Sequence, residues 1–313
     1  MGVKIGVDGG GSKTEIVALD ASGQVLCSQR NPSSNYHVVG MMQAVRSIVS
    51  GIQDCFKEEP LEGIGISLAG IDTAEDWNIM ANGIRAALVS VEQERGTSFR
   101  NLPIVLENDA FGALMSVRGT FSGNVLAVGT GTVALGVNRA GKACRVGGWG
   151  HLIGDQGSGY DIGRKALVAM IASFDGYGPK SVLESLITQH LRLNQVREIV
   201  DWLNQANRTN KDVAALVPVV VEAAGGGDSA AQTILQEAGR DLGLLTLALL
   251  RQTQGQELGL VGGIVHIWEF IKPSFQLTIE EEFPALQFLT PCYPPSVGAA
   301  LLSEIAQVRH IEF

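Results

Sequence analysis

The chain lacks any long hydrophobic run. Its longest strongly apolar stretch, Leu242–Leu250, has nine residues, whereas a membrane-spanning helix needs about 20. The opening sequence MGVKIGVDGGG also lacks the basic start and the apolar core of a signal peptide. We therefore expect no membrane association and a cytoplasmic protein, in which Leu242–Leu250 forms a buried helix.

Positive charge is also scarce. Lys and Arg number 23 against 32 Asp and Glu, which gives a formal net charge of −9. Such a balance provides no broad basic surface, so we expect no nucleic-acid partner. A protein that acts on small molecules fits this composition better.

Clustered cysteines are missing as well. The four cysteines form no CxxC pair and are far apart in the sequence: Cys27, Cys55, Cys144 and Cys292. This spacing indicates neither a zinc site nor an iron–sulfur site. We expect free, mostly buried thiols.

What the chain does contain is an internal repeat. Each copy has a short apolar strand, a glycine-rich turn and a return strand that ends in a second turn. The second turns, at Asp20–Gly23 and Asn138–Gly141, lie 118 positions apart, which suits a duplicated domain of ordinary size. The expected strands are Val3–Val7, Thr14–Leu19, Asn124–Val128 and Val133–Val137.

Helical patterns and further buried strands follow each copy, so we expect two mixed α/β domains in 313 residues. A long helical region runs from about Ser158 to Arg251, with its clearest break at Gly225–Gly227. A last helical pattern, Ser296–Val308, is expected to pack back on the first half. The further strands are expected at Gly63–Ala69, Pro103–Leu106 and Glu257–Val261.

The first glycine loop, Asp8–Thr14, lies between two strands. Its backbone N–H groups, unobstructed by Cβ atoms, can surround phosphate oxygens, and Ser12 and Thr14 add hydroxyl groups. Asp8 is placed to hold Mg²⁺, through the water shell of an ion that dehydrates reluctantly. The alternative is an ordinary glycine hairpin with an acidic turn residue.

Neither glycine loop fits the familiar helix-linked nucleotide motifs. Ser12 separates Gly11 from Lys13, and a strand follows, which excludes a Walker A motif. Gly129–Ala134 matches GxGxxA but enters an extended segment, so we also exclude a dinucleotide fingerprint. Taken as a pair, the two hairpins are expected to hold one triphosphate from both sides.

Asp109 follows the strand Pro103–Leu106 and precedes the helical pattern Ala110–Val117. A helix cap is one explanation for an acid at this point. The other is a catalytic base, since a kinase that acts on an alcohol needs a carboxylate within reach of the attacking hydroxyl. The helix dipole would keep such a carboxylate ionised.

The segment Gly147–Gly159 is dense in glycine and carries Trp149, His151 and Asp155. Asp155 is the better candidate for holding sugar hydroxyls, because a charged acceptor makes a strong directional hydrogen bond. Trp149 also fits an ordinary core, and His151 fits a structural histidine. The glycine turn Val261–Ile264 is a candidate nucleoside contact or a plain turn between a strand and a helix.

These motifs resemble the N-acetylglucosamine kinase branch of the BadF/BadG/BcrA/BcrD ATPase family, within the actin, Hsp70 and sugar-kinase superfamily. The resemblance covers nearly the whole chain, and its most specific part is GGWGHLIGDQGSGY at 147–160. The other matching motifs are VDGGGSKT at 7–14, SSNYH at 33–37, ENDAFGA at 107–113, VGTGT at 128–132 and VGGI at 261–264.

The resemblance implies two RNase H-like, actin-like ATPase domains with a central cleft, formed by residues 1–118 with 296–313 and by 119–295. It implies a homodimeric kinase that uses ATP and Mg²⁺ to phosphorylate an amino sugar, N-acetylglucosamine at O6, with Asp109 as the base. The implied sugar contacts are Asn35, Asp109, Thr132, Gly148, Trp149, Gly150 and Asp155. The implied nucleotide contacts are Asp8, Gly10, Gly11, Ser12, Lys13, Thr14, Gly129, Thr130, Gly131, Ala214, Gly262 and Gly263.

Three alternatives stay open. Val133 and Val146 depart from the polar residue and the cysteine of close relatives of the animal enzyme, which leaves glucosamine or another hexose as the acceptor. The family also contains ATPases that activate dehydratases through a shared iron–sulfur cluster, for which clustered cysteines are missing here. A catalytically silent sugar sensor is the third alternative.

Overall fold

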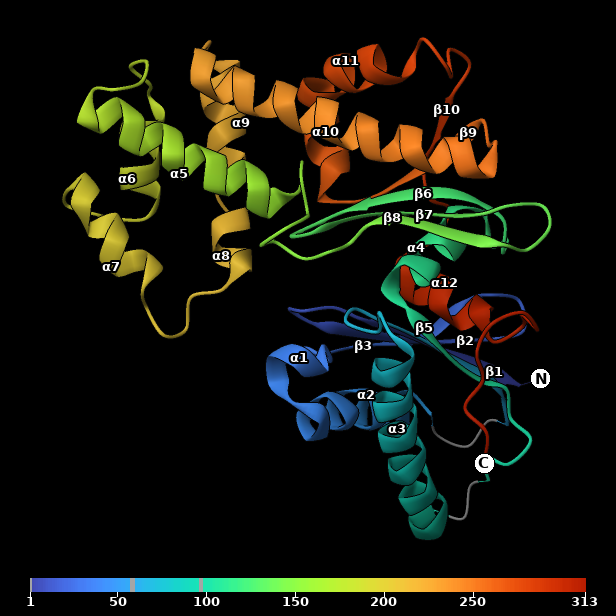
Figure 1. Ribbon diagram of the computed structural model, residues 1–313. Helices are drawn as coiled ribbons and strands as arrows, with labels where there is room; N and C mark the ends of the chain where they lie inside the picture. The colour runs from blue at the N-terminus through green and yellow to red at the C-terminus, as the bar shows by residue number, and fades with distance from the viewer. Residues whose placement is uncertain (1, 57–59, 96–97) are drawn as a thin grey trace. The chain divides into compact units, whose positions relative to one another are not determined.

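A computed structural model describes residues 2–56, 60–95 and 98–313 of the protein. The chain divides into two compact units: Met1–Val125 with Val137–Lys142 and Leu289–Phe313, and Leu126–Gly136 with Ala143–Phe288. Each unit has its own hydrophobic core. Figure 1 shows the α/β architecture of both units.

The first unit is built on a five-stranded sheet in the order β3-β2-β1-β4-β5. β1 runs antiparallel to β2 and parallel to β4, and β4 is parallel to β5. The central strands are apolar and buried, as expected when helices cover both faces. The strands are β1 Val3–Gly9, β2 Thr14–Leu19, β3 Val25–Asn31, β4 Leu61–Leu68 and β5 Ile104–Asn108.

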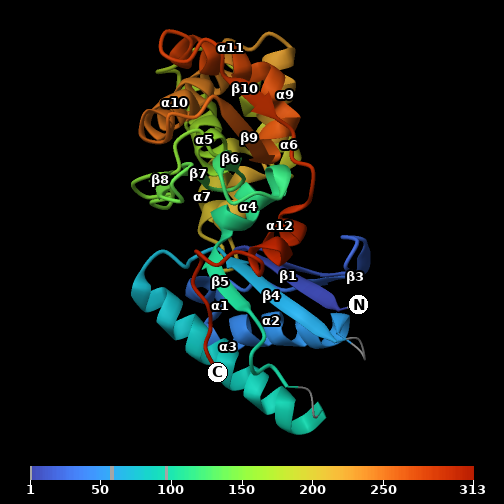
Figure 2. The ribbon, with the colours of Figure 1, turned by 90° about the vertical axis from the view of Figure 1, so that its right-hand side faces the viewer.

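Helices cover both faces of this sheet. α2 and α3 lie on one face, and α4 and α12 lie on the other (Figure 2). α12 packs closely because Gly6 and Gly65 have no side chains, and a Cβ atom there would lie 1.9 Å from the Ser296 carbonyl oxygen and 1.7 Å from that of Ala299. The helices are α1 Tyr36–Val39, α2 Met41–Cys55, α3 Ala74–Arg95, α4 Asp109–Arg118 and α12 Pro295–Leu302.

The second unit contains a five-stranded sheet in the order β10-β9-β6-β7-β8, and α10 packs against β8. Its core is formed by residues such as Leu126, Ile162, Leu242 and Phe275. The strands are β6 Gly123–Val128, β7 Thr132–Val137, β8 Ala143–Gly147, β9 Glu257–Gly262 and β10 Gln287–Leu289. The α-helices are α5 Gly159–Asp175, α6 Leu183–His190, α7 Ile199–Leu203, α8 Asn210–Ala214, α9 Val217–Gly225, α10 Ser229–Thr253 and α11 Trp268–Ile279.

Most expected elements are present. The final helix is shorter than the expected Ser296–Val308, because the chain leaves it after Leu302 and returns along β5. There the Arg309 carbonyl oxygen accepts a hydrogen bond from the Leu106 N–H group, and the Ile311 N–H group donates to the Ile104 carbonyl oxygen. This terminal segment therefore covers part of the sheet edge.

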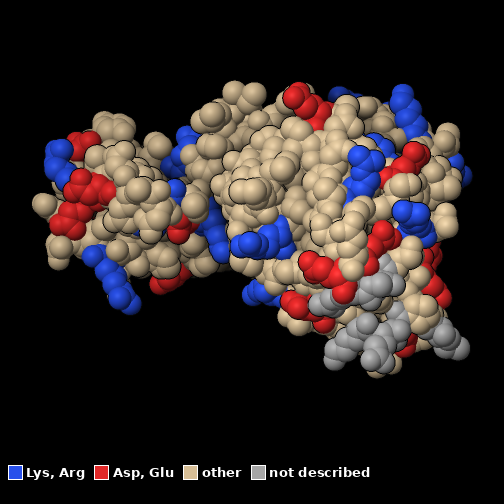
Figure 3. Space-filling model, turned by 90° about the horizontal axis from the view of Figure 1, so that it is seen from below, with Lys and Arg blue, Asp and Glu red and all other residues tan. Residues whose placement is uncertain are grey.

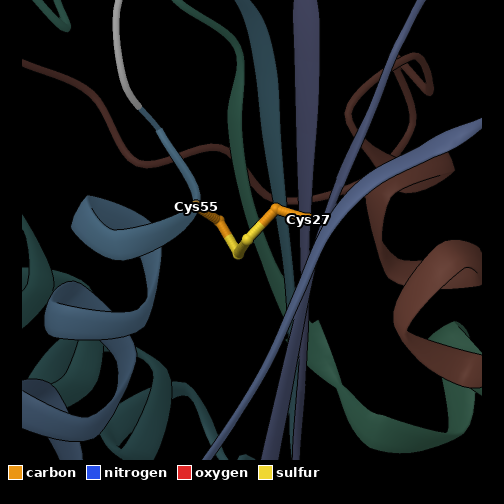
Figure 4. The surroundings of a disulfide bond; sticks show 2 residues. All are labelled: Cys27 and Cys55. Atoms are coloured by element: carbon orange, nitrogen blue, oxygen red, sulfur yellow. A yellow bond between two sulfur atoms is a disulfide. The ribbon is translucent and has the colours of Figure 1, made fainter.

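The expectation that all four cysteines are free is wrong. Cys27 on β3 and Cys55 at the end of α2 form a disulfide, with Cα atoms 5.4 Å apart (Figure 4). α2 packs on β3, which brings together two residues that are 28 positions apart. Cys144 is free and buried, and Cys292 is free and exposed.

Two further expectations concern the surface. Acidic and basic side chains are interspersed over the described residues of the face shown in Figure 3. Among the described residues no single helix is long and apolar enough to span a membrane. One pair of helical segments, Asn210–Gly225 and Ser229–Thr253, reaches that length and hydropathy only when the two are taken together, and a bend of 119° separates them.

Candidate active site

Asp8 and Asp109 are brought to one edge of the first sheet by its parallel strands. β1, β4 and β5 all end at this edge, where Asp8 pairs with Ser67, and Leu68 pairs with Asn108. Asp109 is the next residue and begins α4. The carboxyl edge of such a sheet is where ligands usually bind in open α/β proteins.

The environment of Asp8 disfavours its charged form. Burial and the negative charges of Asp109 and Glu15 raise the pKa of Asp8 to about 7, against a smaller lowering effect of Lys13. Lys13 itself forms an ion pair with Glu15. A perturbed carboxylate at a strand end is typical of a functional site.

The first glycine loop is a tight hairpin. The Gly10 N–H group donates to the Lys13 carbonyl oxygen at 2.9 Å, and Ser33 Oγ donates to the Gly10 carbonyl oxygen at 2.9 Å. A Cβ atom at Gly11 would meet nothing within 4 Å, so the tip of the loop is open. The hydroxyl proton of Thr14 is already used inside the fold, where it is donated to the Pro32 carbonyl oxygen at 2.8 Å.

The cap of α4 is Asn108 and not Asp109. Asn108 Oδ1 accepts a hydrogen bond from the Ala110 N–H group at 3.0 Å. The cap explanation offered for Asp109 is therefore wrong, because its neighbour makes that contact. Asp109 occupies the first turn of α4, where the helix dipole favours a negative charge.

Asn35 lies in a turn beside this edge of the sheet. Its Oδ1 accepts a hydrogen bond from the His37 N–H group and caps the short helix α1. A Cβ atom at Gly70, which has φ of +88°, would lie 2.9 Å from Asn35 Oδ1. Asn35 thus contacts the turn that follows β4.

The second glycine hairpin lies in the second unit, between β6 and β7. The Gly129 N–H group donates to the Gly131 carbonyl oxygen at 2.9 Å. The start of α5 holds the hairpin from outside, because the Gly159 and Tyr160 N–H groups donate to the carbonyl oxygens of Gly129 and Thr130. The strand after it confirms that the dinucleotide interpretation had to be excluded.

Ala214 and Gly262 lie beside the two ends of this hairpin. A Cβ atom at Gly159 would lie 3.2 Å from the Ala214 methyl group and 3.0 Å from the Gly129 carbonyl oxygen. Gly262 has φ of +94°, and a Cβ atom there would lie 2.4 Å from the Val128 carbonyl oxygen. The structure therefore brings together the second-unit residues expected at the nucleotide: Gly129, Thr130, Gly131, Ala214, Gly262 and Gly263.

Asp155 is tied to the same hairpin. Its Oδ1 accepts a hydrogen bond from the Thr132 N–H group at 3.0 Å, and its backbone has φ of +59°. Burial raises the pKa of Asp155, while the Thr132 hydrogen bond and the charges of His151 and Arg145 act in the opposite direction. One carboxylate thus links the glycine-dense segment to the glycine hairpin.

The turn before Asp155 is held by backbone contacts. Arg145 Nη2 donates to the Gly148 carbonyl oxygen at 2.8 Å, and the Gly154 N–H group donates to the Gly150 carbonyl oxygen. Trp149 is 75% exposed, so it does not form ordinary core. His151 is exposed and has structural contacts: its Nδ1 lies 2.9 Å from Asn210 Nδ2, and its ring packs edge-on against Tyr160.

The residues present fit a magnesium ion that is bound together with a nucleotide. Among the described residues no three His, Cys, Asp or Glu side chains are grouped to hold a metal ion. Asp8 nevertheless offers hard oxygen atoms at the open glycine loop, beside the negative charge of Asp109. Mg²⁺ commonly uses one or two carboxylates, phosphate oxygens and water.

Two acidic residues, Asp72 and Asp76, and the helix-capping contact of Asn108 were not predicted from the sequence. Asp76 is a buried acid in the first turn of α3 that accepts hydrogen bonds from Tyr36 and Thr73. Asn108 Nδ2 donates to Asp72 Oδ1 at 3.1 Å. The ENDAFGA and SSNYH motifs contain Asn108 and Tyr36, but no sequence signal connects these residues to the two acids.

Known proteins resemble this chain over nearly its full length. The N-acetyl-D-glucosamine kinase of Dictyostelium discoideum is 32% identical, over 96% of this chain and 97% of its own. The N-acetylmuramic acid/N-acetylglucosamine kinase of Clostridium acetobutylicum is 31% identical over the same shares. A solved Chromobacterium violaceum protein, provisionally named an N-acetylglucosamine kinase, shares the fold with a TM-score of 0.77, at 23% identity over 97% of this chain and 99% of its own.

The profile of the BadF/BadG/BcrA/BcrD ATPase family matches residues 5–303. This match and the two relatives above 30% identity agree with the motifs, the paired glycine hairpins and the carboxylates described above. The chain belongs to the BadF/BadG/BcrA/BcrD ATPase family.

Proposed function

We propose that this protein is an ATP-dependent sugar kinase that phosphorylates an amino sugar, N-acetylglucosamine, to its 6-phosphate. The observation that carries the proposal is the pair Asp8 and Asp109 at one sheet edge, beside an open glycine loop. The two relatives above 30% identity are named as kinases of N-acetylglucosamine, which supports the same reaction.

In this proposal Asp109 is the catalytic base. It removes the proton from the sugar hydroxyl as that oxygen attacks the γ-phosphorus of ATP and the bond from this phosphorus to ADP breaks, a role that suits an ionised carboxylate at a helix start. Asp155 and the amide of Asn35 hold sugar hydroxyls by directional hydrogen bonds. The other proposed sugar contacts are Thr132, Gly148, Trp149 and Gly150.

The nucleotide is proposed to contact both glycine hairpins. Backbone N–H groups stabilise the phosphate charge by hydrogen bonds, and Asp8 holds Mg²⁺ through water. The magnesium ion would neutralise part of the negative charge on the phosphates. That the two hairpins clamp one triphosphate stays a prediction. The proposed contacts are Asp8, Gly10, Gly11, Ser12, Lys13, Thr14, Gly129, Thr130, Gly131, Ala214, Gly262 and Gly263.

We further propose the arrangement implied by the family resemblance. Two actin-like domains, residues 1–118 with 296–313 and residues 119–295, would enclose the substrates in a central cleft, and sugar binding would close it. Closure excludes water and positions the reacting groups. A cytoplasmic homodimer without nucleic-acid or membrane partners completes the proposal.

An ATP-consumption screen tests the function. The panel contains N-acetylglucosamine, N-acetylmuramic acid, glucosamine and glucose, with mass-spectrometric identification of the phosphorylated position. We expect the largest kcat/KM for N-acetylglucosamine and the phosphate on O6. ATP hydrolysis that no sugar stimulates would favour the activator ATPase, and sugar-dependent thermal stabilisation without turnover would favour the sensor.

A further inference from the structure

A network of hydrogen bonds in the first unit connects the turn of Asn35 with the start of α4. Its centre is Asp76, a buried carboxylate that is 8% exposed. The N–H and hydroxyl groups of Thr73 each donate to Asp76 Oδ2 at 2.7 Å, and the Asp72 N–H group donates to it at 3.2 Å. A buried carboxylate with this many donors rigidifies its surroundings.

The network reaches the candidate sugar contact through the residues next to it. The Tyr36 hydroxyl donates to Asp76 Oδ1, and His37 Nε2 lies 3.4 Å from the same oxygen. Although burial acts to raise the pKa of Asp76, the hydrogen bonds from Tyr36 and Thr73 hold it at about 2, so the acceptor stays charged. Asn35 is the residue directly before Tyr36, and its Oδ1 accepts a hydrogen bond from the His37 N–H group.

The other end of the network is Asn108, directly before Asp109. Its Oδ1 caps α4, and its Nδ2 donates to Asp72 Oδ1 at 3.1 Å and to the Ile71 carbonyl oxygen at 3.3 Å. Ser or Asp would cap the helix about equally well. Among these capping residues only Asn has an amide that also donates the hydrogen bonds to Asp72 and Ile71. Asn108 therefore does more than cap α4.

We propose that Asp76, Asp72 and Asn108 are positioning residues, which fix Asn35 and Asp109 relative to each other through one continuous set of hydrogen bonds. This inference rests on the proposed kinase function. In that reaction Asn35 holds the sugar and Asp109 removes its proton, so the distance between them decides how well the hydroxyl is aimed. A displacement of about 1 Å can lower the rate about 100-fold.

Two variants break the network at opposite ends without removing a proposed contact. Asn108→Ser keeps the cap and removes the bonds to Ile71 and Asp72, and Tyr36→Phe keeps the ring and removes the bond to Asp76. Tyr177→Phe is the matched control, because Tyr177 is 72% exposed and lies in the other unit. All assays are run well below the melting temperature of each variant.

We expect each single variant to lower kcat about 10-fold, with the KM for ATP within about 2-fold of the wild type. The decrease in kcat of the double variant should be much smaller than the product of the two single decreases, since both changes disrupt one network. Tyr177→Phe should match the wild type. Single variants with wild-type kcat, or effects that multiply independently, would overturn the inference.

Amide hydrogen exchange of the sugar-free protein separates this inference from the function. Exchange at residues 35–39 should rise in Asn108→Ser, because the lost hydrogen bonds to Ile71 and Asp72 are connected to that segment through Asp76. A wild type that phosphorylates no amino sugar while exchange rises would refute the function and retain the network. Unchanged exchange in a fully active protein would refute the network alone.

Discussion

Asp8 is partly buried, and this burial and the negative charge of Asp109, a residue 101 positions further along the chain, both raise the pKa of Asp8. The relationship arises from the in-register parallel strands β1, β4 and β5, which end together. Two acids at one edge repel each other, and a divalent cation or a proton relieves that repulsion. In the proposed reaction Asp8 acts at the phosphates, where it holds Mg²⁺, and Asp109 removes the proton.

Asp109→Asn removes the proposed base while it keeps the volume of the side chain. We expect kcat to fall about 100-fold or more, with a smaller change in the KM for ATP, because general-base catalysis typically contributes that much. Steady-state kinetics with N-acetylglucosamine measures the effect. Asp175→Asn, an exposed position in the other unit, serves as the control. Near-wild-type turnover in Asp109→Asn would show that another group takes the proton.

The raised pKa of Asp8 predicts a pH-dependent stability. The folded protein holds this proton more tightly than the unfolded chain, so the contribution is fully present below about pH 4 and is lost as the pH rises through about 7. The rise from 3.8 to about 7 corresponds to at most about 4 kcal/mol of the free energy of unfolding.

Asp8→Asn should remove this loss of stability between pH 4 and 8. Denaturant unfolding of the protein without Mg²⁺ and nucleotide measures it. The comparison with the wild type is needed because burial also raises the pKa of Asp155, which acts in the same sense. Equal pH profiles for Asp8→Asn and the wild type would refute the electrostatic account.

Asp155 has two tasks that substitutions can separate. In Asp155→Asn the amide oxygen still accepts the bond from the Thr132 N–H group, whereas the charge that would hold sugar hydroxyls is lost. We expect the KM for the sugar to rise about 10-fold or more and the KM for ATP to change by less than about 3-fold.

Asp155→Ala removes both tasks and leaves the Thr132 N–H group without that acceptor. The KM for ATP should then rise as well, because the glycine hairpin loses the hydrogen bond that holds it to residue 155. Kinetics with each substrate varied in turn distinguishes the two variants. An unchanged KM for the sugar in both would place the sugar away from Asp155.

Many of the strands were predictable, because short apolar runs and the turn-forming residues that bound them indicated the same strand limits. β2 and β9 begin at the expected residues, and the extended segment after Gly131 separates this fold from dinucleotide-binding domains. The end of the last helix was not predictable, since the segment after Leu302 is held by pairing with β5 and not by its own sequence.

The elements on which the candidate residues lie were predictable from the sequence, whereas the contacts of those residues were not. Asn108 and Asp109 are both common caps, and only the backbone decides which one caps α4. The positive φ of Asp155 and its bond to Thr132 depend on contacts between segments that are distant in sequence. The buried Asp76 is invisible to motif reading for the same reason, because its donors come from two separate turns.

The disulfide gives the last prediction. Cys27 and Cys55 close a loop of 28 positions, and loop-closure entropy assigns such a link about 3–4 kcal/mol of stability. Cys27→Ser should therefore lower the free energy of unfolding by up to that amount in non-reducing buffer, and a reductant should do the same to the wild type. Cys292→Ser is the control, because Cys292 is free and exposed. Denaturant unfolding with and without dithiothreitol measures the change, and mass spectrometry of the non-reduced protein reports the linkage. The disulfide would be refuted if dithiothreitol left the free energy of unfolding of the wild type unchanged and the non-reduced protein contained two more alkylatable thiols than expected.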